Sequence, residues 1–262
     1  MKVSPPQFRE VGADQRPIAF RRRAPTRAGE PGIVWLGGFG SDMDSTKAAA
    51  LDAHCERTGR AFLRFDYSGH GLSGGDFALG TVGRWREEAR ELIDNESEGP
   101  QVIVGSSMGG YLALLVAREF RRAKGYVLIA PAVDFTEALL WRNMSEEARR
   151  AIETEGVWRR PSAYSTEPYV YTRELIEDGR RHLLFGGEIR AFAPVRILQG
   201  MEDPDVPHGH ALRLMEHLSS DEATLTLIRD GDHRLSRPQD LELMIQAVEG
   251  FCASTNQGDE QK

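Results

Sequence analysis

The sequence predicts an α/β fold, in which a mostly parallel central sheet carries helices on both faces. Short β-branched runs alternate along the chain with longer amphipathic segments, which is typical of layered α/β domains. Several of the short runs are continuously apolar, as expected of central parallel strands that are covered on both faces. A chain of 262 residues can bury one substantial core, so we expect residues 1–262 to form a single domain.

The expected strands and helices follow one another in a regular order. The runs Ile-Val-Trp-Leu at 33–36 and Val-Ile-Val at 102–104 have no polar member, which favours buried central strands. Thr81 is a suitable N-cap for a helix that starts at the next residue. Strands are predicted at residues 18–23, 33–36, 61–65, 102–104, 126–129, 196–198 and 224–228. Helices are predicted at residues 45–57, 82–96, 108–120, 209–218 and 238–251.

Residues 131–193 break this alternation. They contain no convincing strand, and their pattern predicts helices, one of them at residues 172–184. A connection this long in a compact domain usually serves a function. The segment is rich in large apolar side chains, which need something to cover or to bind. We therefore expect a helical cap over the end of the sheet rather than a bland insertion, with Trp158 and Tyr164 as candidate substrate-binding residues.

Composition and charge argue against several classes of partner. The net charge of −7 disfavours nucleic acid and gives no support to docking on anionic membranes. No apolar run approaches the roughly 18 residues of a membrane span. Cys55 and Cys252 do not make a disulfide framework, and the first residues show no signal-peptide pattern. We expect a cytoplasmic protein with reduced thiols that binds neither membranes nor nucleic acid.

The strongest local motif is the sequence Gly-Ser-Ser-Met-Gly at residues 105–109, a G-x-S-x-G pattern. Such a short pattern also occurs by chance, but here a buried strand leads into it and a helix leads out of it, as this nucleophile motif requires. The central serine must lie in a tight turn that exposes its Oγ, and side chains at positions 105 and 109 would collide there. Ser107 is therefore the predicted nucleophile, whereas Ser106 should point into the structure.

A serine hydroxyl needs a base that takes its proton, and an acid that orients the base. With this motif the acid and then the histidine follow the serine along the chain. The strand at 196–198 leads into a turn at the carboxyl edge of the sheet, where open α/β sheets build their sites. Asp203 in this turn is the preferred acid, although spacing alone does not exclude Asp205 or Glu202. His233 follows the last strand, so it is the predicted base.

An oxyanion formed on a substrate carbonyl needs two hydrogen-bond donors. The backbone N–H of Met108, next to the nucleophile, is one candidate. The backbone N–H of Phe39 is the other, in a glycine-rich loop at residues 36–40 that could alternatively be only a tight turn. The loop at residues 66–73 is expected to be mostly structural. We see no metal-ligand cluster and no phosphate-binding loop in the sequence, so no metal or cofactor is expected.

These motifs together resemble the α/β-hydrolase superfamily over residues 18–251. The residues that carry the resemblance are 66–71 (Asp-Tyr-Ser-Gly-His-Gly), 105–110 (Gly-Ser-Ser-Met-Gly-Gly), the Gly-x-x-Asp-x-x-Val-Pro turn ending at Pro207, and Asp232-His233. The resemblance implies the α/β-hydrolase fold with a helical cap and a triad of Ser107, Asp203 and His233.

A closer resemblance is to the family of the mitochondrial α/β-hydrolase domain-containing protein ten. It is carried by Ser41-Asp42-Met43 with Thr46-Lys47-Ala48, by residues 64–69, Gly156-Val157-Trp158, Pro161-Ser162, Tyr164-Ser165 and Asp232-His233-Arg234. This family implies palmitoyl-protein thioesterase and acyl-glucuronide esterase activity. The chain departs from it in lacking a transit peptide and in the Gly37-Gly38 start of its oxyanion loop. The first departure suggests a bacterial-type, cytoplasmic relative and leaves the physiological substrate open.

We therefore expect a capped serine hydrolase that cleaves an ester or thioester through an acyl-enzyme. Its substrate would be a small-molecule ester or thioester, or an acylated protein. A serine peptidase on the same fold is an alternative, since cap carboxylates such as Glu153 and Glu155 could hold a peptide terminus. The other alternative is a binding protein with an idle triad.

Overall fold

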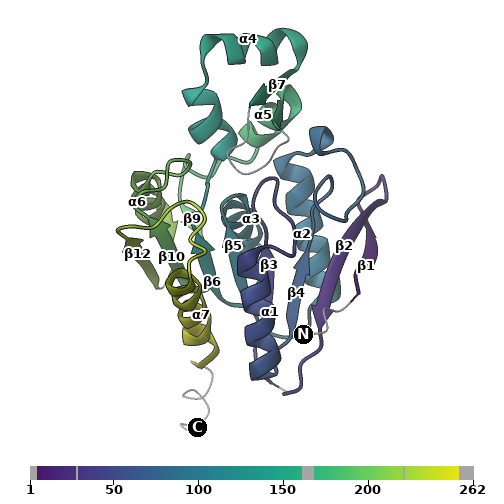
Figure 1. Cartoon of the computed structure of the whole chain (residues 1–262), viewed down its shortest axis with the longest axis vertical. Coiled ribbons are helices and arrows are strands. Elements are labelled where there is room, and N and C mark those ends of the chain that lie inside the picture. The colour runs from purple at the N-terminus through teal and green to yellow at the C-terminus, as the bar shows by residue number, and fades with distance from the viewer. Residues whose placement is uncertain (1–4, 28, 161–167, 221, 254–262) are drawn as a thin grey trace.

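The computed structural model describes residues 5–27, 29–160, 168–220 and 222–253. Its centre is an eight-stranded sheet with the strand order β1-β2-β4-β3-β5-β6-β10-β12. The strands from β4 to β12 in this order pair in parallel, whereas β2 pairs antiparallel with both β1 and β4. The expected α/β architecture is confirmed (Figure 1). The strands of the sheet are β1 (Gln7–Val11), β2 (Arg16–Arg23), β3 (Gly32–Leu36), β4 (Phe62–Phe65), β5 (Gln101–Ser106), β6 (Ala123–Ile129), β10 (Val195–Gly200) and β12 (Ala223–Ile228).

Helices cover both faces of the sheet. Helices α1 and α7 lie in front of it in Figure 1, and α2 and α3 lie behind it. The helices of the sheet domain are α1 (Thr46–Thr58), α2 (Val82–Glu96), α3 (Met108–Ala117), α6 (His208–His217) and α7 (Pro238–Cys252), with a short 3-10 turn η1 (Phe77–Leu79) before α2. No helix in the described part of the chain has the length and apolar character that a bilayer crossing requires.

The period of two along each central strand divides the apolar side chains between two cores. In β3, Ile33 and Trp35 join the core beneath α1 and α7. Val34 and Leu36 point the other way and join the core beneath α2 and α3. Successive side chains of a strand alternate between faces, so a strand that is apolar throughout must be covered on both sides. This explains why the central strands lack the polar alternation of an exposed sheet.

Strand β1 was not among the predicted strands, and β2 begins two residues earlier than expected. Four of the five residues of β1 are exposed or half-buried, and only Val11 is buried. An edge strand of this kind is held by its backbone pairing with β2 rather than by an apolar face. A hydrophobic pattern is therefore a poor guide to such a strand.

The segment between β6 and β10 rises above the carboxyl edge of the sheet (Figure 1), and we refer to it below as the cap. It contains the helices α4 (Glu146–Glu155) and α5 (Arg173–Arg180), as well as the short turns η2 (Thr136–Leu140) and η3 (Trp141–Asn143). The expectation of no strand here was wrong, because β7 (Val157–Arg160) and β8 (Tyr169–Thr172) form an antiparallel pair. Two-residue strands β9 (Ile189–Arg190) and β11 (Leu218–Ser219) also pair with each other. Strand β7 includes Arg159 and Arg160, both exposed, so it lacks an apolar pattern.

Candidate active site

Ser107 lies at the sharp turn between β5 and α3. Its backbone has φ 54° and ψ −118°, which is a strained conformation for a residue with a side chain. Two hydrogen bonds hold the turn: the Ser107 N–H donates to the carbonyl of Ile129 over 2.8 Å, and the Ala132 N–H donates to the Ser107 carbonyl over 3.1 Å. The preceding Ser106 is buried, whereas Ser107 is half-buried. The turn therefore exposes Ser107 and not its neighbour.

The two glycines of the motif are required by close backbone contacts. A Cβ at Gly105 would lie 2.4 Å from the carbonyl oxygen of Gly109. A Cβ at Gly109 would lie 2.0 Å from the carbonyl oxygen of Leu36. The second contact joins the start of α3 to the end of β3, where the predicted oxyanion loop begins. Glycine at position 109 thus allows this loop to pass directly beside the nucleophile.

Asp203, His233 and Ser107 lie in hydrogen-bond contact in that order. The distance from His233 Nδ1 to Asp203 Oδ2 is 2.8 Å, and the distance from His233 Nε2 to Ser107 Oγ is 3.1 Å. The Asp203 carboxylate can only accept a hydrogen bond, so His233 Nδ1 carries the proton and donates it to this bond. Nε2 is then left to accept the serine proton. Asp203 is buried and His233 is half-buried. The structure therefore brings together the three residues predicted from motif order.

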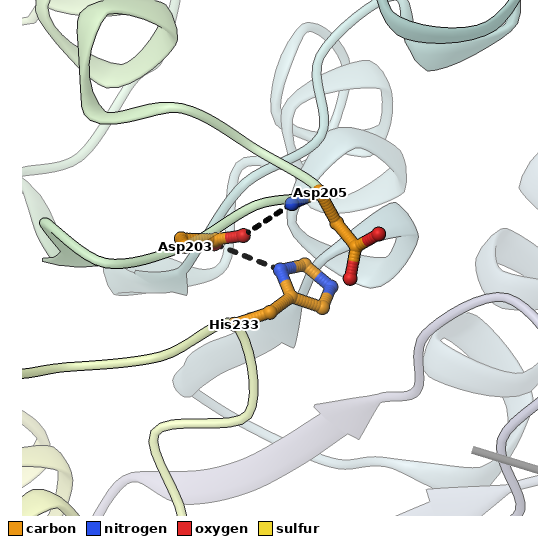
Figure 2. A group of neighbouring side chains, drawn as sticks. All are labelled: Asp203, Asp205 and His233. Carbon is orange, nitrogen blue, oxygen red and sulfur yellow. Dashed lines mark hydrogen bonds and ion pairs between the residues drawn. The ribbon is translucent and has the colours of Figure 1, made fainter. Parts of the chain in front are cut away.

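The two alternative acids have other positions. Glu202 is exposed, although its backbone N–H donates to the carbonyl of Gly231. Asp205 uses its backbone N–H to donate to Asp203 Oδ1 over 2.9 Å. Its carboxylate lies on the other side of the His233 ring from Asp203 (Figure 2). Of the three acids, Asp203 is the one hydrogen-bonded to His233 Nδ1.

Gln199 is a buried residue of this site that the sequence reasoning missed. Its side-chain Nε2 lies 3.2 Å from Asp203 Oδ2 and 2.9 Å from the carbonyl oxygen of Val206. The Val206 N–H also donates to Asp203 Oδ1 over 2.8 Å. These donors hold the Asp203 carboxylate toward the histidine. A polar amide inside the apolar strand β10 was the signal that could have found it.

His70 fixes the predicted oxyanion loop. The Gly40 N–H donates to His70 Nε2 over 3.1 Å, and His70 Nδ1 donates to the carbonyl of Ser68 over 3.1 Å. Burial lowers the pKa of His70 to about 4, so the ring is neutral near pH 7 and Nε2 can accept. A Cβ at Gly38 in the same loop would lie 3.4 Å from Cβ of Ser107. The loop carrying Phe39 therefore runs beside the nucleophile, and Met108, the residue after Ser107, begins α3.

Lys47 of α1 anchors the loop that carries His233. Its ammonium donates to the carbonyl of Arg234 and lies 3.4 Å from Ser236 Oγ. Burial and, to a lesser extent, the neighbouring charge of Arg234 lower the pKa of Lys47 to about 8. The lysine thus ties α1 to the histidine loop through the Arg234 carbonyl and the Ser236 hydroxyl rather than through the histidine itself.

The candidate binding residue Trp158 takes part in an aromatic stack that joins the cap to the site. Trp158 stacks on Tyr171 with ring centroids 5.8 Å apart, and Tyr171 stacks on Phe39 at 5.6 Å. Both cap residues come from the β7–β8 hairpin, so the hairpin rests on the predicted oxyanion loop. Tyr164, the other candidate binding residue, lies outside the described residues.

One group of side chains within the described ranges has the spacing of a metal site. Asp203, Asp205 and His233 each offer a ligand atom within 4.8 Å of the others. Asp203 already accepts hydrogen bonds at both oxygens, and His233 uses both ring nitrogens. Those bonds match an acid–base–serine relay, so we interpret the group as part of that relay rather than as a metal centre.

Comparison with known proteins places this chain among the alpha/beta hydrolases. A model of the alpha/beta hydrolase family matches residues 31–242. The mitochondrial palmitoyl-protein thioesterase ABHD10 of Bos taurus is 34% identical over 235 residues, which are 88% of this chain and 75% of that protein. The Homo sapiens protein of the same name is 34% identical over 222 residues, or 84% of this chain and 72% of that protein.

Two solved structures are similar to this chain over almost its whole length. A putative hydrolase from Agrobacterium vitis S4 has a TM-score of 0.90 and 44% identity, covering 96% of this chain and 100% of its own. Mouse alpha/beta hydrolase domain-containing protein 10 has a TM-score of 0.85 and 31% identity, covering 96% and 99%. Est1E from Butyrivibrio proteoclasticus, in a structure with ferulic acid bound, shares the fold at 19% identity, 95% and 98% coverage and a TM-score of 0.77.

Proposed function

Because this chain belongs to the alpha/beta hydrolase family, we propose that it is a serine hydrolase that cleaves carboxylic esters or thioesters through an acyl-enzyme. The observation that carries the proposal is the contact between Ser107 Oγ and His233 Nε2, made at 3.1 Å on a strained turn. A serine, histidine and aspartate in this order are the parts that acyl transfer needs.

In the first half-reaction, Ser107 Oγ attacks the substrate carbonyl carbon while His233 Nε2 takes the hydroxyl proton. Asp203 holds the ring through Nδ1 and stabilises the imidazolium that forms. His233 then gives the proton to the leaving oxygen or sulfur, and the acyl group stays on Ser107. In the second half-reaction, water attacks the acyl carbon with His233 as base, which releases the acid and restores Ser107.

We assign the oxyanion donors to the backbone N–H groups of Met108 and Phe39. Met108 is the first residue of α3, so its N–H lies at the positive end of the helix dipole. The contact between Gly38 and Ser107 supports the placement of the loop that carries Phe39. In other enzymes one such donor contributes roughly 10²–10³ to the rate.

The named activity of the ABHD10 relatives supports a palmitoyl-thioester or related acyl substrate. An acyl glucuronide is a second candidate, because the same attack on a carbonyl cleaves either bond. Aromatic side chains at the cap–site junction, including Trp158 and Tyr171, favour an apolar acyl group or a flat aromatic acid. We also propose Trp158 as a substrate-binding residue and place Tyr164 in the same role.

The first prediction concerns the nucleophile. Ser107→Ala should reduce hydrolysis of p-nitrophenyl esters and of a palmitoyl thioester by at least about 10³-fold, because the Ser107 hydroxyl is the one that contacts His233 Nε2 within the described residues. Ser106→Ala is the matched control, since Ser106 is buried one residue away, and it should retain activity. Fluorophosphonate labelling should occur in wild type and in Ser106→Ala but not in Ser107→Ala.

Three outcomes would contradict the proposal. Full activity of Ser107→Ala would remove Ser107 as the nucleophile. Cleavage of aminoacyl-naphthylamides without ester cleavage would favour a peptidase. A binding protein would be favoured if the wild-type protein neither hydrolysed any of these substrates nor reacted with the fluorophosphonate.

A further inference from the structure

Asp205 brings a second carboxylate to the histidine of the site. Its backbone N–H donates to Asp203 Oδ1 over 2.9 Å, which fixes the position of the residue in the turn. One oxygen of Asp205, one of Asp203 and one ring nitrogen of His233 lie within 4.8 Å of one another. Figure 2 shows the Asp205 carboxylate beside Nε2, on the opposite side of the ring from Asp203. Asp203 orients the ring through Nδ1, whereas Asp205 lies toward Nε2, the nitrogen that contacts Ser107. The Asp205 carboxylate is therefore on the side of the ring where the substrate must bind.

The same carboxylate also faces the cap. Burial raises the pKa of the Tyr171 hydroxyl, and the nearby charge of Asp205 adds to the rise. Arg160 of β7 interacts with the same hydroxyl and lowers its pKa. Lys47 donates to the Arg234 carbonyl, on the loop that carries His233. Asp205 therefore lies between His233 and the cap.

The chemistry of proton transfer locates the leaving group next to Asp205. His233 Nε2 gives its proton to the leaving oxygen or sulfur, so that atom must come within hydrogen-bond reach of Nε2. The next atoms of the leaving group then lie a few ångströms from the Asp205 carboxylate. At about 5 Å and an effective dielectric constant near 20, two unit charges interact strongly enough to change binding by more than tenfold.

We propose that Asp205 makes the site selective for the charge of the leaving group. Neutral and cationic leaving groups are accepted, and those with a negative charge close to the scissile bond are disfavoured. This inference rests on the proposed serine-hydrolase function and narrows its substrate class. It favours thioesters of neutral or basic thiols, such as an acylated cysteine flanked by basic residues, over acyl glucuronides, whose leaving group carries a carboxylate.

The test uses three butyryl thioesters that differ in the charge of a leaving group of similar length. They are the thioesters of thiocholine, which is cationic, 2-mercaptoethanol, which is neutral, and 2-mercaptoethanesulfonate, which is anionic. We expect Asp205→Asn to lower the ratio of kcat/KM for the cationic over the anionic substrate by about tenfold. The kcat/KM for the neutral substrate should change by less than about threefold. This value also serves to normalise each enzyme preparation for its active fraction.

Glu202→Gln is the matched control, because it removes one charge from the same turn at an exposed position. It should leave the ratio at the wild-type value, and 1 M NaCl should reduce the wild-type ratio by screening. An unchanged ratio in Asp205→Asn, or an equal shift in Glu202→Gln, would overturn the role of Asp205 while the hydrolase function stands. If wild type hydrolyses none of the three thioesters, and no p-nitrophenyl ester, the proposed function fails as well.

Discussion

His70 supports the oxyanion loop only while its imidazole is neutral. Nε2 must keep a lone pair to accept from the Gly40 N–H, and burial lowers the pKa of the ring to about 4. In the unfolded chain the pKa is about 6.5, so below that pH the unfolded state binds more protons than the folded state. The contribution of His70 to stability is therefore complete above about pH 6.5 and is lost as the pH falls toward 4.

The prediction at the residue scale compares wild type with His70→Gln. Between pH 7 and pH 5, the free energy of unfolding of wild type should fall by about 2 kcal/mol more than that of the variant. Glutamine has no titration in this range but can still accept from Gly40 N–H, so the variant serves as its own control for the loop contact. Urea unfolding at the two pH values measures the difference, and equal pH dependence would exclude a buried neutral His70.

Individual residues of the site differ in how far their role could be predicted from the sequence. Ser107 and His233 follow from a motif and from chain order, because the chemistry requires them at the ends of particular strands. Asp203 was one of three acids in a single turn, and only coordinates show which carboxylate meets Nδ1. The contacts of Gln199 and His70 depend on side-chain directions across the sheet, which no local pattern contains.

At the scale of elements, α5 of the cap is fastened to α2 of the sheet domain. Asp178 Oδ2 accepts a hydrogen bond from the Gly83 N–H, in the first turn of α2, over 2.7 Å. Burial alone would raise the pKa of Asp178, but interactions with His182, the Gly83 N–H and Arg181 outweigh it and hold the pKa below its usual range. A carboxylate from one helix thus caps the positive end of another.

The prediction for this contact is that Asp178→Ala lowers the free energy of unfolding by about 1–2 kcal/mol, the usual value of a helix cap with a favourable dipole interaction. Glu177→Gln, at an exposed position of the same helix, should change it by less than about 0.5 kcal/mol. Denaturant unfolding at pH 7 measures both. Equal effects of the two substitutions would show that the contact contributes nothing specific.

The helices were predicted more accurately than the minor strands. Helix α2 was expected at 82–96, as observed, because its N-cap and its amphipathic pattern agree. Helix α3 ends at Ala117 rather than at residue 120, where Phe120 is still buried although it lies outside the helix. The β7–β8 hairpin went unpredicted because its strands are only four residues long and half of β7 consists of exposed arginines.

On the scale of the whole molecule, packing at the amino edge of the sheet is remote from the chemistry. Phe251 of α7 fills the space left by Gly125 near the start of β6, where an added Cβ would lie 2.3 Å from its ring. The Arg196 guanidinium lies over the same ring, 4.2 Å from its centroid. The site residues instead follow the carboxyl ends of β5, β10 and β12. Parallel strands separate these two edges by their full length.

This separation predicts that Phe251→Ala reduces stability without changing the reaction. The loss of a buried phenylalanine should cost about 3–5 kcal/mol in free energy of unfolding, while kcat per folded enzyme stays within about twofold. Phe8→Ala is the matched control, because Phe8 is 58% exposed on the edge strand β1 and should cost far less. Thermal unfolding and steady-state kinetics well below Tm distinguish the two effects, and a large fall in kcat would contradict the separation.

The root of the cap is closed by one residue. Asp134 accepts hydrogen bonds from the N–H groups of Leu184 and Phe185, over 2.8 and 2.9 Å, so the segment leaves the sheet domain and returns to it at a single point. The entropy of closing a loop grows slowly with its length, by about 0.6 kcal/mol for each doubling. The length of chain between residues 135 and 183 should therefore have little effect on the clasp at Asp134, although α5 and the β7–β8 hairpin also contact the sheet domain. A cap of different length and sequence could be grafted at the same clasp and alter substrate range, while the sheet and the serine beneath it stay as they are.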